Sequence, residues 1–290
     1  MKRTHALARA SEFLRGHARP LELRVFERVF EGGAAADVVA ALREFRNTDG
    51  GFGHGLEADV LAPTSQPVAV EFAVRTLIEA DAVDRSLLQD ACRFIAGVAD
   101  PDGGVATLVP SAFESPRAVH WNGDWATTPR LNPTASLAAL LRSQGIEHPW
   151  IERATVWSLA RLRAQPLITS GHTLSCALTF LPTTDEPDTT ELIERCIAQL
   201  ADAEHFALHA PFNIYGLTPL DVAPTADHPL RPYFPRSCID AHLDHLAAQQ
   251  QPDGGWPIAW TPPNEAAARA WRGRWTLSSL RVLRDNDRLI

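Results

Sequence analysis

Hydrophobic residues recur at helical spacing along most of the chain, and two kinds of helix alternate. In residues 37–46 the apolar positions fall at i, i+3 and i+4, which predicts an amphipathic helix with one face in water. The next stretch, QPVAVEFAVRTLIEAD at 66–81, is apolar almost all round and has Pro67 in its first turn. Such a pattern is typical of a buried helix.

The same alternation continues to the end of the sequence, and it predicts the fold class. Amphipathic helices need water on one side, whereas apolar helices need protein on nearly every side. Two concentric rings satisfy both requirements, so we expect an all-α protein: a single α/α toroid of five or six helical hairpins. Its outer helices are amphipathic and its inner helices apolar. An open α-solenoid is the alternative. The further amphipathic segments are 85–100, 148–164, 188–204 and 237–251, and the further apolar ones are 132–146, 170–181 and 264–286.

A short motif, Asp-Gly-Gly, follows three of the predicted outer helices. It occurs as TDGGF at 48–52, PDGGV at 101–105 and PDGGW at 252–256. Glycine can take the left-handed conformation that ends a helix, and the aspartate can accept hydrogen bonds from turn N–H groups. We therefore interpret Asp49, Asp102 and Asp253 as structural. The aromatic residue would pack across neighbouring helices, and glutamines such as Gln250 would bind the next repeat.

Composition narrows the possible functions. The chain has 290 residues and a net charge of −8, with no basic run, which argues against nucleic-acid binding. The sequence contains no signal-peptide pattern and no apolar run long enough to span a membrane, so we expect a cytoplasmic protein.

We expect one domain over 1–290, with helices in 1–33 and a long, lid-like, proline-rich loop at 205–237. No pattern for a cofactor or a metal site stands out.

One loop gathers the strongest candidates for catalysis. Residues 51–67, GFGHGLEADVLAPTSQP, hold His54, Glu57 and Asp59 just before a predicted inner helix. Two carboxylates and an imidazole at the edge of an apolar cavity can divide acid and base roles, with burial raising one carboxyl pKa. The same carboxylates can also cap turns and pair with arginines, and both interpretations stay open.

Other loops supply candidates for substrate binding. Residues 119–133 contain His120, Trp121 and Trp125, together with Asp124 as a further catalytic candidate. In the long loop, Phe212 and Tyr215 would cover the cavity, and at the start of an inner helix we expect His172 to bond a backbone carbonyl. Trp260 and Trp271 complete the predicted aromatic lining.

The motif carries a resemblance to a known superfamily. The stretch QQPDGGW at 250–256 resembles the QW motif of terpene cyclases and protein prenyltransferases, and AWRGRWTLSSLRVL at 270–283 looks like the end of such a repeat. The resemblance implies an α/α toroid acting on isoprenoids. The Asp-x-Asp-Asp acid motif of squalene-type cyclases is absent, and Cys238, Asp240 and His242 have the wrong order for the prenyltransferase zinc site.

Three functions remain open at this point. The first is an enzyme that acts on an isoprenoid or other apolar chain, in which Glu57 or Asp59 protonates an alkene or epoxide and tryptophan faces stabilise the cation. The second is a carbohydrate-active toroid that uses paired carboxylates beside tryptophans. The third is a toroid that binds a ligand without catalysis. An aromatic lining would favour the first, and two opposed carboxylates in a polar groove the second.

Overall fold

The computed structural model describes residues 2–165, 167–209 and 215–289. Within them the chain forms twelve α-helices joined by loops and short 3₁₀ turns, with isolated bridges but no strand. The helices are α1 (Lys2–His17), α2 (Pro20–Glu31), α3 (Ala35–Arg43), α4 (Pro67–Glu79), α5 (Arg85–Val98), α6 (Leu131–Ser143), α7 (Pro149–Ala164), α8 (Gly171–Phe180), α9 (Thr189–Gln199), α10 (Pro219–Val222), α11 (Arg236–Ala248) and α12 (Glu265–Asp285).

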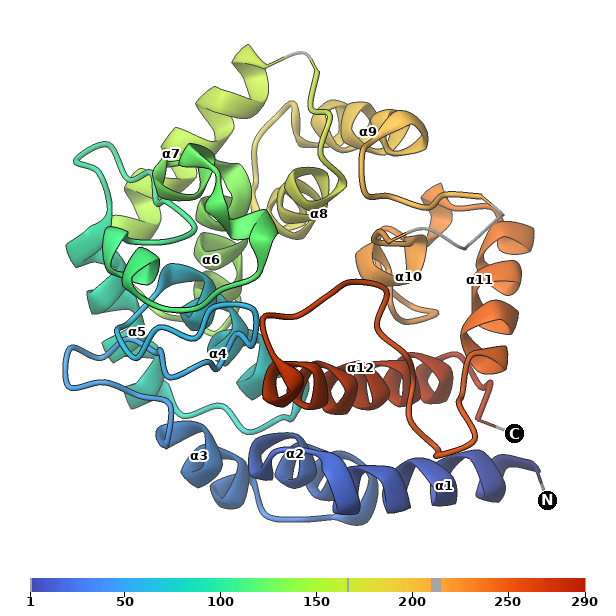
Figure 1. The fold of residues 1–290 in the computed structure, drawn as a ribbon. Helices are drawn as coiled ribbons and strands as arrows, with labels where there is room; N and C mark the ends of the chain where they lie inside the picture. The colour runs from blue at the N-terminus through green and yellow to red at the C-terminus, as the bar shows by residue number, and fades with distance from the viewer. Residues whose placement is uncertain (1, 166, 210–214, 290) are drawn as a thin grey trace.

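The helices form a ring with an inner and an outer layer (Figure 1). Helices α4, α6, α8, α10 and α12 lie nearer its centre, while α1, α3, α5, α7, α9 and α11 lie toward the periphery. The last helix, α12, packs against both α1 and α11, so the two ends of the chain meet and the ring closes. The predicted all-α toroid is confirmed.

Inner helices α4, α6 and α8 each bury more than half of their residues, as the hydrophobic pattern predicts, whereas inner helix α12 buries eight of its 21. Inner helix α6 buries nine of its thirteen residues, whereas outer helix α5 buries five of fourteen. Proline starts α4 and α7, where its missing N–H costs nothing. One continuous set of buried side chains runs from α1 to α12 and forms the core between the layers.

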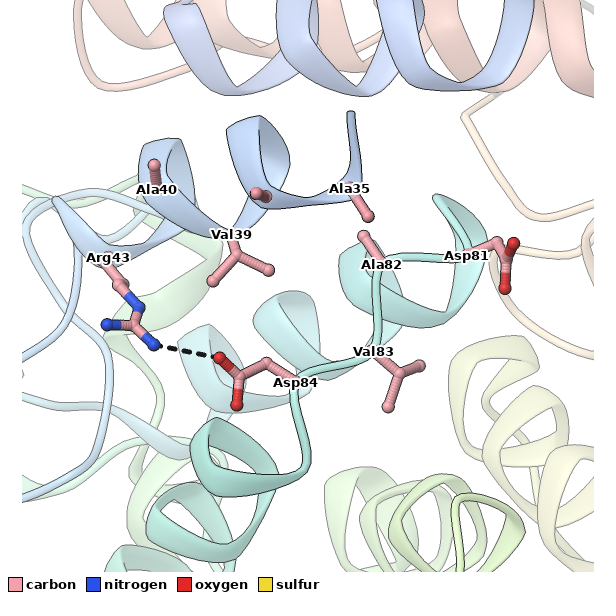
Figure 2. Close-up of a pocket in the computed structure, with 9 residues that line it drawn as sticks. Ala35, Val39, Ala40, Arg43, Asp81, Ala82, Val83 and Asp84 are labelled. Atoms are coloured by element: carbon pink, nitrogen blue, oxygen red, sulfur yellow. Dashed lines mark hydrogen bonds and ion pairs between the residues drawn. The ribbon is translucent and has the colours of Figure 1, made fainter. Parts of the chain in front are cut away.

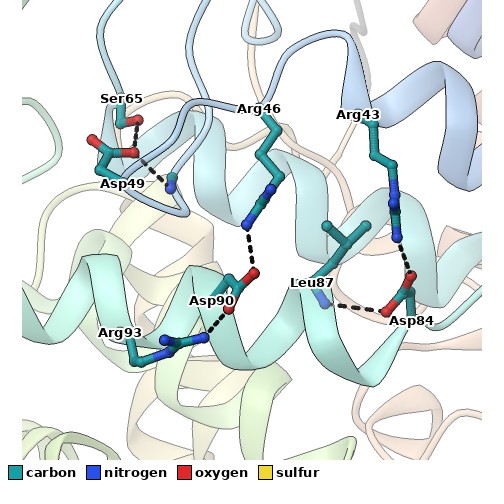
Figure 3. A network of polar contacts seen from close by, with 9 residues as sticks. Arg43, Arg46, Asp49, Ser65, Asp84, Leu87, Asp90 and Arg93 are labelled. Carbon is teal, nitrogen blue, oxygen red and sulfur yellow. Dashed lines mark hydrogen bonds and ion pairs between the residues drawn. The ribbon is translucent and has the colours of Figure 1, made fainter.

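The three Asp-Gly-Gly motifs fold into the same turn. In each, the backbone N–H two residues before the aspartate donates to the carbonyl of the second glycine, at 2.8–2.9 Å. The aspartate carboxylate accepts the N–H of that glycine, at 2.9 Å for Asp49, 3.4 Å for Asp102 and 3.1 Å for Asp253. Figure 3 shows the first copy, where Asp49 also accepts the Ser65 hydroxyl at 2.7 Å. These contacts confirm the structural interpretation of the three aspartates.

The first glycine of each motif touches the backbone of the next outer helix. Gly50, Gly103 and Gly254 all have positive φ, from 88° to 105°. A side-chain carbon would lie 2.8 Å from a backbone oxygen of α5 at Gly50 and 2.6 Å from a backbone nitrogen of α7 at Gly103. At Gly254 it would clash with the Arg9 carbonyl of α1. The motif therefore joins consecutive outer helices, and its last copy closes the ring.

Each second glycine packs under an aromatic ring of the same neighbouring helix. A side-chain carbon would lie 2.7 Å from Phe94 at Gly51, 2.7 Å from Trp157 at Gly104 and 2.8 Å from Phe13 at Gly255. The sequence analysis did not identify these rings as partners of the glycines. In each helix the ring stands four residues after a residue that touches the first glycine, so one helical turn sets the spacing.

The residues around the last motif behave as expected. Gln250 donates its amide to the Ala6 carbonyl at 2.9 Å, across the point where the ring closes. Trp256 is 1% exposed, and its indole N–H donates to the Leu246 carbonyl at 2.7 Å.

The long loop at 205–237 is more structured than predicted, because it contains α10, whose Leu220 and Val222 are buried.

Candidate active site

The loop that carries Glu57 and Asp59 is fixed in place by its backbone. The Arg19 guanidinium donates to the carbonyls of Gly55 and Leu56, at 2.8 and 3.2 Å. The Asp59 carbonyl accepts the Ala118 N–H at 2.8 Å, which ties this loop to the segment that carries His120. The two carboxylates therefore project from a stretch of chain that is held at both ends.

Asp59 lies buried against two tryptophans and a histidine. Its side chain is 3% exposed, and Oδ2 accepts the indole N–H of Trp260 at 2.9 Å. The His120 Nε2 atom lies 3.6 Å from the same oxygen, while Oδ1 is buried and has no hydrogen bond. Burial raises the pKa of Asp59 to about 6, and the indoles of Trp271 and Trp260 partly offset that rise. The indole nitrogen of Trp271 is buried and makes no hydrogen bond, so Trp260 is the indole that donates to Asp59.

Glu57 is a buried neighbour of Asp59 on the same loop. It is 6% exposed, and its Oε2 accepts the backbone N–H of Asp59 at 3.0 Å. Burial, and then the negative charge of Asp59, raise the pKa of Glu57 to about 8. Glu57 contacts the backbone of Asp59, whereas the carboxylate of Asp59 accepts the indole N–H of Trp260, so Asp59 is the one of the two carboxylates that hydrogen-bonds an aromatic ring.

Among the described residues, five rings form an aromatic cluster beside Asp59. Trp260 meets Tyr215, Trp271 and Trp275 edge to face, with ring centroids 5.5, 5.1 and 6.0 Å apart. Trp271 in turn meets Phe72 of α4 at 6.0 Å. Of these rings, Tyr215, Trp260 and Trp271 were predicted for substrate binding, and the structure brings these three together. Trp275, one turn beyond Trp271, and Phe72 on the facing inner helix were not predicted.

A neutral hydrogen-bonded pair borders this cluster. The His172 Nε2 atom lies 3.1 Å from the Tyr215 hydroxyl, so the expected bond to a backbone carbonyl is wrong. Burial, followed by the positive charges of His205 and His120, lowers the pKa of His172 to about 4. Burial, and then the charges of Asp59 and Glu57, raise the pKa of Tyr215 to about 12. Both side chains are therefore uncharged near pH 7.

Three further predicted residues form an aromatic strip that begins at Asp59, where the His120 side chain is itself half exposed. The ring of Trp121 lies 5.4 Å from His120 and 5.5 Å from Trp125. Trp125 is 37% exposed, and the Arg130 guanidinium lies over it at 5.2 Å. Burial, and then the charge of His205, lower the pKa of His120. Its contact with Asp59 is an ion pair only when the imidazole is protonated.

The remaining candidates lie away from Asp59 or outside the described residues. His54 is exposed, and its Nε2 atom lies 2.9 Å from the Asn47 side-chain oxygen. Asp124 is exposed, and its carbonyl accepts the hydroxyls of Thr127 and Thr128. Phe212 falls outside the described residues, so its predicted role remains a prediction.

The described residues also contain a groove far from these carboxylates. It has a volume of about 670 Å³ and lies between α3 and the turn from α4 to α5 (Figure 2). Its lining is mostly alanine and valine, and its Arg43 and Asp84 already pair with each other at 2.9 Å.

No group of three histidine, cysteine or acidic side chains in the described ranges is arranged to hold a metal ion. No helix among these residues is long and apolar enough to cross a membrane.

Comparison with known proteins identifies the fold. No family model matches the chain, and no curated protein is similar to it in sequence. Among solved structures, a protein from Actinoplanes matches with a TM-score of 0.60 and 16% identity, over 98% of this chain and 99% of that one. The type II terpene cyclase MstE from Scytonema matches with a TM-score of 0.57 and 14% identity, over 98% and 99% of the two chains. The chain has a terpene cyclase-like fold.

A third match is a variant of MstE solved in complex with geranylgeranyl dihydroxybenzoate, described as its substrate. It has a TM-score of 0.56 and 12% identity, and the match covers 97% of both chains. The terpene cyclase-like fold thus spans nearly the whole chain. At such low identity the likeness establishes the fold, and any function must be argued from the side chains around Asp59.

Proposed function

We propose that this protein is a terpene cyclase-like enzyme that acts on an isoprenoid or other apolar chain, with Asp59 as the acid. The observation that carries the proposal is the environment of Asp59. It is a buried carboxyl group with a pKa near 6, in direct contact with a cluster of aromatic rings. A protonated carboxyl beside electron-rich rings is the arrangement that acid-initiated cation chemistry requires.

The proposed reaction is an isomerisation. The carboxylic acid of Asp59 adds its proton to a carbon–carbon double bond or an epoxide, and positive charge develops on carbon. A second double bond attacks that cation and closes a ring, and the reaction ends when a C–H proton is lost. The rings of Trp271, Trp275 and Tyr215 would stabilise the cation. The indole N–H of Trp260 would stabilise the carboxylate left on Asp59, because hydrogen bonds to the charged form favour it.

Glu57 has a supporting role in this proposal. Its Oε2 atom accepts the Asp59 backbone N–H, so it fixes the backbone of the residue that contacts the Trp260 indole. A second negative charge so close disfavours ionisation of the pair, which keeps a proton on the site at higher pH. Glu57 is therefore proposed as a positioning residue rather than as the acid.

The likeness to MstE supports an isoprenoid as the substrate class, since MstE was solved with a geranylgeranyl compound as its substrate. A carbohydrate-active enzyme has less support. Glycosidases place two carboxyl groups on either side of the scissile bond. Here Glu57 and Asp59 are neighbours on one loop, and Asp124 is exposed.

Solvent deuterium labelling tests this proposal. The purified protein is incubated in D₂O with polyprenyl compounds, beginning with geranylgeranyl dihydroxybenzoate, and products are analysed by mass spectrometry. We expect a cyclised isomer that carries one deuterium, because the initiating proton comes from solvent through Asp59. Asp59→Asn should lower the rate by roughly 10²–10⁴-fold, the usual contribution of a general acid.

A matched control separates chemistry from folding. Asp202→Asn makes the same change at an exposed position outside the Asp-Gly-Gly turns and should leave the rate unchanged. Cyclisation that persists at full rate in Asp59→Asn, or a product without deuterium, would contradict the assignment of Asp59. Thermal unfolding of both variants should show that each is folded.

A further inference from the structure

A second cluster of functional side chains lies on α4 and α12, outside the site described above. Arg75 pairs with Glu71 at 2.8 Å, and Arg274 and Arg281 each pair with Glu79 at 2.7 Å. We refer to these five residues as the ionic cluster. Burial alone would raise the pKa of Glu79, but Arg274, Arg281 and Arg75 lower it below its ordinary value. Glu79 is therefore ionised, with two guanidinium groups paired to it and the charge of Arg75 nearby.

The ionic cluster shares the inner face of the ring with the aromatic cluster. On α4 the residues at 69, 70, 73, 74, 76 and 77 are buried, so the opposite stripe at 71, 72, 75 and 79 faces away from the core. The charged side chains of this stripe keep 12–33% of their surface exposed. The Arg274 guanidinium lies 4.9 Å from the ring of Phe72, where the two clusters meet.

The charges of the ionic cluster do not balance. Three arginines face two glutamates, which leaves one positive charge in a protein whose net charge is −8. Each arginine already pairs with a glutamate, so the excess charge is shared across the cluster. An anion bound beside these partly exposed side chains would supply the missing counter-charge.

We propose that the ionic cluster binds a single carboxylate at the head of the substrate, while the apolar tail lies on the aromatic cluster beside Asp59. This inference rests on the proposed function and adds an amphiphilic, monoanionic substrate class to it. Trp271 and Arg281 are separated by ten residues of one helix, or roughly 15 Å along its axis. One excess positive charge matches one negative charge, and it favours a carboxylate over a phosphate or diphosphate ester.

Binding measurements can test the proposal without turnover. Three probes share one tail and differ in the head group: farnesoic acid, farnesol and farnesyl monophosphate. Calorimetry at pH 7.5 and low salt should show that the acid binds at least tenfold more tightly than the alcohol, and no more weakly than the phosphate ester. Arg281→Gln should weaken binding of the acid about tenfold and leave binding of the alcohol unchanged, whereas Arg281→Lys should keep most of the preference.

The control lies on the same helix. Arg284, three residues further on, pairs with Asp285 and the Val29 carbonyl, and Arg284→Gln should change neither affinity. Equal affinities for acid and alcohol, or an unchanged preference in folded Arg281→Gln, would overturn the inference and leave the cluster with only a role in holding α4 to α12. Tighter binding of the phosphate ester would overturn the monoanion assignment.

The head-group preference measured by calorimetry does not depend on the chemistry proposed for Asp59. Asp59→Asn should retain the preference for the acid, because Asp59 contacts Trp260 and His120 rather than the arginines of the ionic cluster. Loss of cyclisation in Asp59→Asn without any head-group preference in the parent would remove only the head-group inference. A head-group preference together with normal cyclisation in Asp59→Asn would support the inference and contradict the proposed function.

Discussion

The three Asp-Gly-Gly turns, which are the joints between outer helices, and the inner face of the ring depend on sequence in different ways. Each joint is built from about five consecutive residues, Asp-Gly-Gly and its neighbours, and the same turn forms at all three copies. The inner face brings together side chains from distant loops and helices; the hydrogen bond between Trp260 and Asp59 spans 201 residues. Local chemistry specifies the joints, whereas only the closed ring assembles the candidate site.

This difference predicts that the joints matter for stability and the inner face for chemistry. A substitution at a joint should loosen the whole ring, because each turn is packed on the next outer helix. A substitution at Asp59 should leave the ring intact. Variants of the two regions can therefore test whether the roles separate in this way.

The largest stability effect is expected where the ring closes. Gly254 has a φ of 92°, and a methyl group there would clash with the Arg9 backbone. We expect Gly254→Ala to lower the free energy of unfolding by at least about 3 kcal/mol, because both strain and a backbone clash are introduced. Chemical denaturation with circular dichroism measures this loss.

Gly97 gives a matched control. It lies in α5, and a side-chain carbon there would have nothing within 4 Å. Gly97→Ala should be neutral or stabilise by up to about 1 kcal/mol, as expected for alanine in a helix. Equal effects of the two substitutions would show that the last joint does not hold the ring closed.

A smaller effect is expected from Glu57, and it depends on pH. Burial raises the pKa of Glu57 from an ordinary value of 4.5 to about 8, so folding favours its protonated form. As pH rises from 5 to 8, the unfolded chain ionises Glu57 first, and the stability from this residue is lost. We expect Glu57→Gln to reduce the loss of stability between pH 5 and pH 8 by at least about 1.4 kcal/mol, the equivalent of one pKa unit.

Thermal or chemical unfolding at several pH values measures that slope. Asp59→Asn should reduce the slope less, because burial raises the pKa of Asp59 by a smaller amount, to about 6. Parallel pH profiles for Glu57→Gln and the parent protein would show that Glu57 is not held in a protonated form by its surroundings.

The sequence predicted the outer layer well, for physical reasons. Helical periodicity and proline positions gave the helices, and the Asp-Gly-Gly motifs gave the turns, because both depend on residues close in the chain. The rings of Phe13, Phe94 and Trp157 were missed, since their partners lie on a different segment. Sequence spacing alone does not show which glycine a ring will cover.

The candidate site was predicted in part. The loop at 51–67 was identified, but its three ionisable residues separated: Glu57 and Asp59 turned inward, and His54 pairs with Asn47 at the surface. A left-handed backbone at His54, with a φ of 56°, and the bonds from Arg19 set that division. The ionic cluster was also missed, because residues 66–81 were predicted to be apolar almost all round and the arginines that pair with Glu79 come from α12.

The central claim, that the ring encloses Asp59 as a carboxyl group ready to donate a proton, can be measured directly. The ¹³Cγ chemical shift of Asp59, assigned by comparison with Asp59→Asn, is followed by NMR as pH is varied. The account predicts a midpoint near pH 6, and a higher midpoint in Trp260→Phe, which removes a hydrogen bond to the carboxylate. A midpoint near 4, the ordinary value for a solvated aspartate, would contradict it.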